Sequence, residues 1–154
     1  MTVHEQMQAF IRYYKRENKV TEVKMADIAV FAAKQGWKLP KPLTGIDRLA
    51  KKFAEAAREE TRYDKKTRRP YRANLCIPQL ALWIDTDEAD REKMVMAVGK
   101  YREQMIGEAE IGTNTVEHWN LIHPEQVPIP FPLDFADEVE WRRNAPPEED
   151  QKTG

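Results

Sequence analysis

The longest run without a charged side chain, Ala73 to Ile84, constrains the fold more than any other segment. It has 12 residues and contains Pro78. A membrane-spanning helix needs about 20 apolar residues, so this run is too short to cross a bilayer. Apolar and aromatic residues on either side of Pro78 predict two strands, Tyr71 to Ile77 and Leu80 to Asp85, joined as a β-hairpin.

Composition limits the size of the hydrophobic core. Val, Ile, Leu and Phe supply 31 of the 154 residues, which is close to the range of disordered chains, while the net charge of −1 favours folding. The sequence therefore predicts a modest core within one globular domain over residues 1–143. Residues 144–154 contain no core-forming side chain, and they predict a disordered acidic tail.

The N-terminal charges and the single cysteine indicate the cellular compartment. His4, Glu5 and Arg12 interrupt any apolar secretory leader, so we expect a soluble, cytoplasmic protein. Cys76 is the only cysteine, so neither an internal disulfide nor a cysteine zinc cluster can form. It stands in an apolar strand segment, where a thiol commonly packs as a small hydrophobic side chain.

The spacing of apolar residues predicts three helices in the N-terminal half. Apolar side chains recur at positions i, i+3, i+4 and i+7, which places them on one face of a helix. The predicted helices span about His4 to Arg16, Lys24 to Gln35 and Gly45 to Glu60. Thr44, with Asp47 three residues later, resembles a capping box at the start of the third helix.

The pattern changes after the third helix. Residues Tyr63 to Tyr71 are polar and aperiodic, which predicts a turn leading into the hairpin. After the hairpin, Thr86 or Asp87 is expected to cap a helix over residues 88–106, and Val116 to Ile122 predicts one short helix.

Every second residue from Pro128 to Pro132 is proline, which predicts an extended proline-rich C-terminal segment that packs on its own core or docks on a partner. The predicted fold is therefore α+β and mostly helical, with three N-terminal helices, a β-hairpin, a further helix and this extended segment.

The near-zero net charge hides two halves of opposite sign. Residues 1–75 contain 18 Lys and Arg against 9 Asp and Glu, whereas residues 76–154 contain 7 against 17. Residues 34–72 alone contain 13 basic and 5 acidic side chains. Such a density is typical of a surface that faces a polyanion, although a charged helical face is also common where it only contacts solvent.

Three helices followed by a hairpin, with a basic third helix and a basic turn after it, resemble the winged-helix arrangement of DNA-binding domains. The resemblance covers about residues 3–85 and implies that the third helix enters the major groove while the hairpin touches the flanking backbone. One departure is the connection Gly36 to Leu43, which is longer than the usual turn between two such helices.

The resemblance implies a set of nucleic-acid-binding residues. Arg48, Lys51, Lys52 and Glu55 share one helical face, where Arg and Lys can contact guanine or phosphate and Glu can accept from cytosine. The basic residues after the helix would bind phosphates irrespective of sequence. The full set is Thr44, Arg48, Lys51, Lys52, Glu55, Lys65, Lys66, Arg68, Arg69 and Arg72.

A second resemblance covers most of the chain. It rests on the segments Tyr71-Arg72, Arg102 to Met105, Glu117 to Asn120, Pro128 to Phe135 and Val139 to Arg142. On these segments the chain resembles a family of uncharacterised bacterial proteins, which brings no established activity and implies no catalytic residue.

Patterns of catalytic residues are weak, so we expect neither a catalytic residue, a metal site nor a cofactor. His118 and His123 are five residues apart, whereas a metal-binding pair on one helical face is commonly four apart. The acidic cluster Asp85 to Asp90 lacks the spacing of a calcium loop and is equally typical of a helix N-terminus. Glycine-rich phosphate loops and nucleophile elbows are absent from the sequence.

The sequence thus favours a non-catalytic, DNA-binding accessory or regulatory protein. The alternative is a protein-interaction or scaffold module that forms an oligomer or docks on another protein through the helix 88–106 and the proline-rich segment. A small hydrolase that uses the acidic cluster is the least favoured interpretation.

Overall fold

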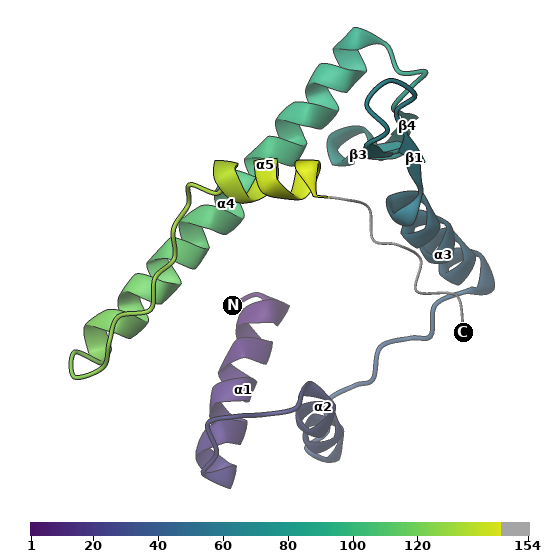
Figure 1. The fold of residues 1–154 in the computed structure, drawn as a ribbon. Helices are drawn as coiled ribbons and strands as arrows, with labels where there is room; N and C mark the ends of the chain where they lie inside the picture. The colour runs from purple at the N-terminus through teal and green to yellow at the C-terminus, as the bar shows by residue number, and fades with distance from the viewer. Residues whose placement is uncertain (146–154) are drawn as a thin grey trace, which may run out of the picture. The chain divides into compact units, whose positions relative to one another are not determined.

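The computed structural model describes residues 1–145 of the chain (Figure 1). It is an α+β fold, 59% helical, with five helices and two small antiparallel sheets in the described residues. The predicted α+β, mostly helical class is confirmed. Most of the predicted acidic tail, residues 146–154, lies outside the described residues. Within residues 1–145, no helix combines the length and the apolar character needed to cross a bilayer.

Contacts divide the chain into two compact units, Met1–Arg48 and Leu49–Gly154. The sequence places its internal division elsewhere, between a basic part 3–85 and an acidic part 86–143. The two divisions differ because the sign of surface charge does not determine which segments pack together. The single domain over residues 1–143 remains a prediction.

The first unit contains two helices, α1 (Val3–Asn18) and α2 (Met25–Lys34), as the sequence predicts. Thr2 and Glu5 form a capping box that satisfies N–H groups at the start of α1. The ring of Phe10 lies 5.9 Å from that of Phe31 and 5.1 Å from that of Trp37, measured between centroids. Aromatic contacts therefore join α1, α2 and the segment after α2.

The third predicted helix is also confirmed as α3 (Gly45–Glu59), and the Thr44 hydroxyl accepts a hydrogen bond from the Asp47 N–H at its start. Two short strands that the sequence did not predict follow it. They are β1 (Thr61–Tyr63) and β2 (Pro70–Arg72), which pair antiparallel. The segment predicted as a turn is therefore the end of a hairpin.

The predicted hairpin in the uncharged run is present as β3 (Asn74–Ile77) and β4 (Leu82–Asp85), joined by a 3-10 turn, η1 (Pro78–Leu80). The predicted continuous strand Tyr71 to Ile77 is wrong, because the chain leaves one sheet and enters the other at Ala73. The Ala73 N–H donates to the carbonyl of Glu60, and its own carbonyl accepts from the Thr86 N–H. Each sheet consequently has two strands.

The core of the second unit lies between the β3–β4 hairpin and α4 (Arg91–Ile122). Ile77 is fully buried, and Ile84 and Ala97 are buried beside it. Cys76 points away from this cluster and is half-buried opposite Trp83 in the strand pair. The modest core that the composition predicts is therefore built around the uncharged run.

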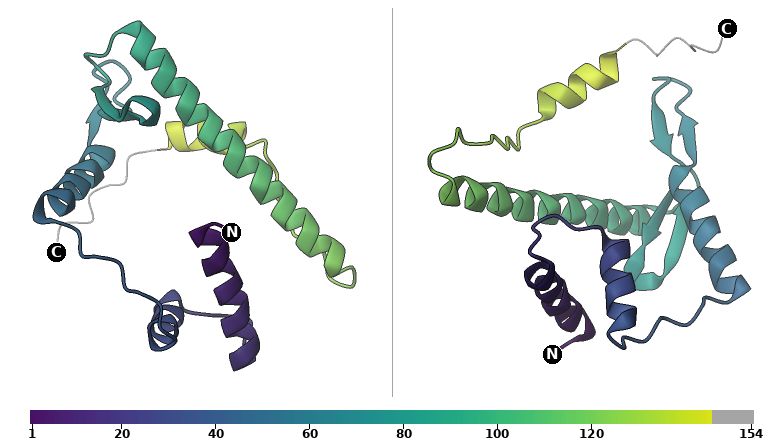
Figure 2. Two further views of the ribbon diagram at one scale, coloured as in Figure 1. Left: turned by 180° about the vertical axis from the view of Figure 1, so that it is seen from behind. Right: turned by 90° about the horizontal axis from the view of Figure 1, so that it is seen from below.

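Helix α4 differs from the prediction at both ends. It begins after Asp90, whose carboxylate accepts from the Lys93 N–H, rather than after Thr86 or Asp87. It does not stop near residue 106, and it absorbs the short helix predicted over residues 116–122 into one element of 32 residues. Gly107 does not end it, because glycine in a helix interior costs only about 1 kcal/mol relative to alanine. Figure 2 shows α4 unbroken in both views.

After α4 the chain turns back and reaches α5 (Ala136–Asn144), a helix that the sequence did not predict. The returning segment contacts α4: the Asn120 side chain exchanges two hydrogen bonds with the backbone of Ile129. The ring of Phe131 lies against Gly112, where an added Cβ would stand 2.8 Å from two ring carbons. The part with alternating prolines has neither helix nor strand.

Candidate nucleic-acid interface

One face of α3 carries the predicted base-contacting residues. Arg48, Lys51, Lys52 and Glu55 are all exposed, and their spacing places them together on one side of the helix. Ile46, Leu49 and Phe53 form the apolar stripe, and they are also exposed. Both faces of α3 are therefore exposed, and the role of the polar face in binding a ligand stays a prediction.

The β1–β2 hairpin brings four of the predicted phosphate-binding residues together at its tip. The Asp64 carboxylate accepts hydrogen bonds from the N–H groups of Lys66 and Thr67, which holds the turn closed. These two bonds lower the pKa of Asp64. Arg68 adopts a left-handed conformation with φ of 58°. The residues of this basic turn are Lys65, Lys66, Arg68 and Arg69.

A cluster of charges fixes the β1–β2 hairpin to the end of β4. The Arg62 guanidinium donates to both carboxylate oxygens of Asp85, at 2.9 and 2.7 Å, and to Asp87 at 2.7 Å. The Tyr71 hydroxyl also donates to Asp87. We refer to Arg62, Tyr71, Asp85 and Asp87 as the Arg62 cluster.

The Arg62 cluster changes the pKa values of its members. Hydrogen bonds from Arg62 and from the Asp87 N–H lower the pKa of Asp85 from 3.8 to about 2. The same carboxylates hold the pKa of Arg62 above its usual value. Partial burial raises the pKa of Tyr71, and the neighbouring Asp87 raises it further. Asp85 at the end of β4 and Asp87 just after it thus bind Arg62, and Asp90 caps α4.

Hydrogen bonds also connect α3 to both hairpins. The Arg72 guanidinium donates to the carbonyl of Arg58, and the Asn74 amide donates to the carbonyl of Ala57 and to the Glu60 carboxylate. These hydrogen bonds satisfy backbone carbonyls at the C-terminal end of α3, which have no hydrogen-bond partner within the helix. The end of α3 and the basic turn are therefore parts of one connected structure.

The described ion pairs separate the cations into two groups. Across residues 1–145, the cations in ion pairs are Arg62, Lys93 and Arg143. None of the cations on α3 or in the basic turn belongs to such a pair in that range, although Arg69 donates to the Asn144 side chain at 3.3 Å. These positive charges are available to an anionic ligand.

The other predicted positions have local roles. Thr44 caps α3, and Arg72 joins β2 to α3. His123 stacks on Trp119 with ring centroids 4.2 Å apart, and its Nδ1 lies 2.9 Å from the carbonyl oxygen of Trp119. These contacts account for His123 as a residue that ends α4.

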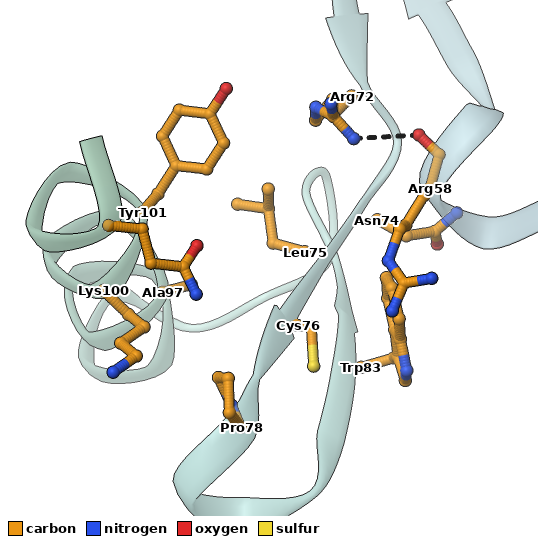
Figure 3. A pocket seen from close by; sticks show the side chains of 11 residues that line it. Arg58, Arg72, Asn74, Leu75, Cys76, Pro78, Trp83, Ala97, Lys100 and Tyr101 are labelled. Carbon is orange, nitrogen blue, oxygen red and sulfur yellow. Dashed lines mark hydrogen bonds between the residues drawn. The ribbon is translucent and has the colours of Figure 1, made fainter. Parts of the chain in front are cut away.

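The sequence did not single out a groove between α3, β3 and α4 (Figure 3). Arg58, Trp83, Lys100 and Tyr101 line it and come from three different elements. Arg58 lies over the ring of Trp83, 5.4 Å from its centroid. The only sequence signal is that Arg58 stands three residues after Glu55 and therefore continues the basic face of α3.

Comparisons with protein families, curated proteins and solved structures find no match to this chain. The resemblances to winged-helix domains and to uncharacterised bacterial proteins therefore remain predictions from the sequence.

Proposed function

We propose that this chain binds duplex DNA without catalysing a reaction, with the exposed face of α3 toward base edges and the basic turn toward the phosphate backbone. The observation that carries the proposal is the concentration of mostly exposed cations, unpaired within the described residues, on α3 and in the basic turn. They lie in a segment, residues 34–72, that contains 13 basic and only 5 acidic side chains. Arg62 is bonded to carboxylates, whereas the cations of α3 and of the basic turn have no carboxylate within ion-pair distance in the described residues.

The chemistry of the two surfaces assigns them different roles. Arg48 and Lys52 on α3 can discriminate base edges in a major groove wide enough to admit a helix. Lys65, Lys66, Arg68 and Arg69 offer charge at a rigid turn, which suits phosphate contacts that position the protein and do not depend on sequence. Regulatory or accessory action would follow from binding, because the proposal includes no chemical step.

A salt titration with labelled duplex DNA tests the proposal. Replacing the four cations of the basic turn by Gln should lower the slope of log K against log salt by about 3 to 4, because each phosphate contact contributes about 0.9. The double variant Arg48→Ala, Lys52→Ala should instead reduce the preference for one sequence over another.

A control with the same charge change comes from α1 and its C-cap. Replacing Arg12, Lys15, Arg16 and Lys19 by Gln removes four cations outside the proposed interface. An equal loss of affinity in this control would contradict a localised interface, since net charge alone would then explain binding. Absence of duplex binding at low salt would exclude the proposed function.

The exposed apolar surface of α4 favours a second candidate function, a protein-interaction module. A groove of about 740 Å³ between α4 and the returning segment is lined by Met105, Ile111, Phe131, Leu133 and other residues. A second copy of this chain or another protein could dock there. Sedimentation over a range of concentrations tests self-association, which Met105→Glu should abolish because it places a charge in the apolar groove.

A further inference from the structure

The groove of Figure 3 has a strongly positive lining. It encloses about 290 Å³, and its lining includes Arg58, Arg72 and Lys100 but no carboxylate. The chain as a whole contains slightly more acidic than basic residues, so a concave site lined only by cations among its charged groups is not explained by composition. Such a site attracts an anion, because walls of one sign raise the local potential.

The same groove offers aromatic and apolar surface. Tyr101 is 50% exposed on α4, and Trp83 carries the Arg58 guanidinium over its ring. Leu75 and Cys76 contribute from opposite faces of β3, so the groove passes along one edge of that strand. Flat rings bind beside aromatic and guanidinium groups by stacking. The lining therefore suits a ligand that joins a flat ring to an anionic group.

The volume limits what can enter. A cavity of about 290 Å³ is at the lower end of the range of about 300–1,000 Å³ for small-molecule sites. It is too small for a base pair with both backbones. One nucleotide, with a single base and its phosphate, combines the ring, the negative charge and the size that the groove accepts.

The groove also lies at the end of the proposed DNA surface. Arg58 follows Lys51 by seven residues and Glu55 by three, so it is on the same face of α3 and extends it. Arg72, which donates to the Arg58 carbonyl, comes from the hairpin that carries the basic turn. The end of a DNA strand that extends beyond a duplex bound on α3 would therefore lie beside this groove.

We propose that this groove binds one unpaired nucleotide, with its base against the ring of Tyr101 on the α4 side of β3 and its phosphate held by the cations Lys100 and Arg72. The inference rests on the proposed function, because the unpaired nucleotide is expected to come from the end of a duplex bound on α3. A free mononucleotide has the same chemistry, and the test separates the two sources.

The experiment uses the full chain and three probes: a blunt duplex, the same duplex with three unpaired thymidines, and thymidine monophosphate alone. The overhang should increase affinity by about fivefold to tenfold over the blunt duplex, through stacking of one base and one more phosphate contact. Tyr101→Ala and Lys100→Gln should each remove this gain and leave the affinity for blunt duplex within about twofold. Tyr101→Phe should retain it, because the ring remains.

The outcomes separate the inference from the proposed function. Salt-dependent binding of the blunt duplex without any gain from the overhang would overturn the inference and leave the proposed function standing. Binding of thymidine monophosphate that Tyr101→Ala weakens, without duplex binding, would support the nucleotide site and exclude the duplex surface. Inorganic phosphate that competes as well as thymidine monophosphate would overturn the inference, since the base would then contribute nothing.

Discussion

The two β-hairpins of the second unit are stabilised in different ways. The β3–β4 hairpin buries Ile77 and Ile84 against α4. The β1–β2 hairpin has no buried residue in either strand. Its attachment to the remaining structure depends on the Arg62 cluster and on the hydrogen bonds that connect Arg72 and Ala73 to the end of α3.

This difference shows how a small domain can expose charge. A hairpin held by apolar burial must keep its side chains inside, whereas a hairpin held by polar contacts at its base leaves the side chains at its tip facing solvent. The basic turn is consequently free of any packing role. We expect the β3–β4 hairpin to determine the stability of the unit and the β1–β2 hairpin to determine binding.

The largest expected effect is on the core hairpin. Ile77→Ala should lower the free energy of unfolding by about 2–4 kcal/mol, because it removes a fully buried side chain and leaves a cavity. Chemical denaturation monitored by circular dichroism measures this change.

The matched control is Leu82→Ala, since Leu82 pairs with Ile77 across the strands but is 38% exposed. It should cost less than half as much. Tyr63→Ala in β1 should change stability by no more than about 0.5 kcal/mol, as is usual for exposed positions. A similar cost at all three positions would remove the distinction between the hairpins.

Acid should loosen the β1–β2 hairpin before the core hairpin. The folded pKa of Asp85 is about 2, below its ordinary value of 3.8, so its contribution to stability is present above pH 4 and is lost as the pH falls toward 2. Asp64, whose pKa is also lowered, acts in the same direction. Amide hydrogen exchange should show β1–β2 opening in this range while β3–β4 stays protected.

Asp85→Asn provides the control, because it cannot ionise. The variant should exchange faster in β1–β2 at neutral pH and lose most of the change between pH 4 and 2. If β3–β4 opens first on acidification, the Arg62 cluster does not hold the β1–β2 hairpin.

Periodic and capped elements could be predicted from the sequence. The helices α1 to α3 have apolar residues at helical spacing, and Thr44 marks the start of α3. The β3–β4 hairpin follows from the uncharged run. The β1–β2 hairpin was not predicted because each of its strands has only three residues, without alternation of apolar and polar side chains. Strand β2 also begins with Pro70, a residue that is rare in strands.

The errors in the second half have similar causes. The helix predicted over residues 88–106 stops just before Gly107, yet α4 continues through it because a single glycine is a weak signal for a helix end. The helix α5 lacks an apolar stripe and therefore carried no periodic pattern. The groove escaped because Arg58, Trp83 and Lys100 are far apart in the sequence, and only the packing of α4 on β3 brings their elements together.

The left-handed backbone of Arg68 has a consequence for how this chain could change. In that conformation the Cβ of an L-residue crowds the backbone, which costs roughly 1 kcal/mol, and asparagine tolerates it better. Arg68→Asn should therefore stabilise the fold by less than about 1 kcal/mol, seen as a slightly higher melting temperature. It should also lower the salt slope of duplex binding by about 0.9. Selection for heat resistance alone would favour Asn at position 68, whereas selection for DNA binding would favour Arg68. Under each kind of selection, a different one of these two chains should therefore become the more frequent.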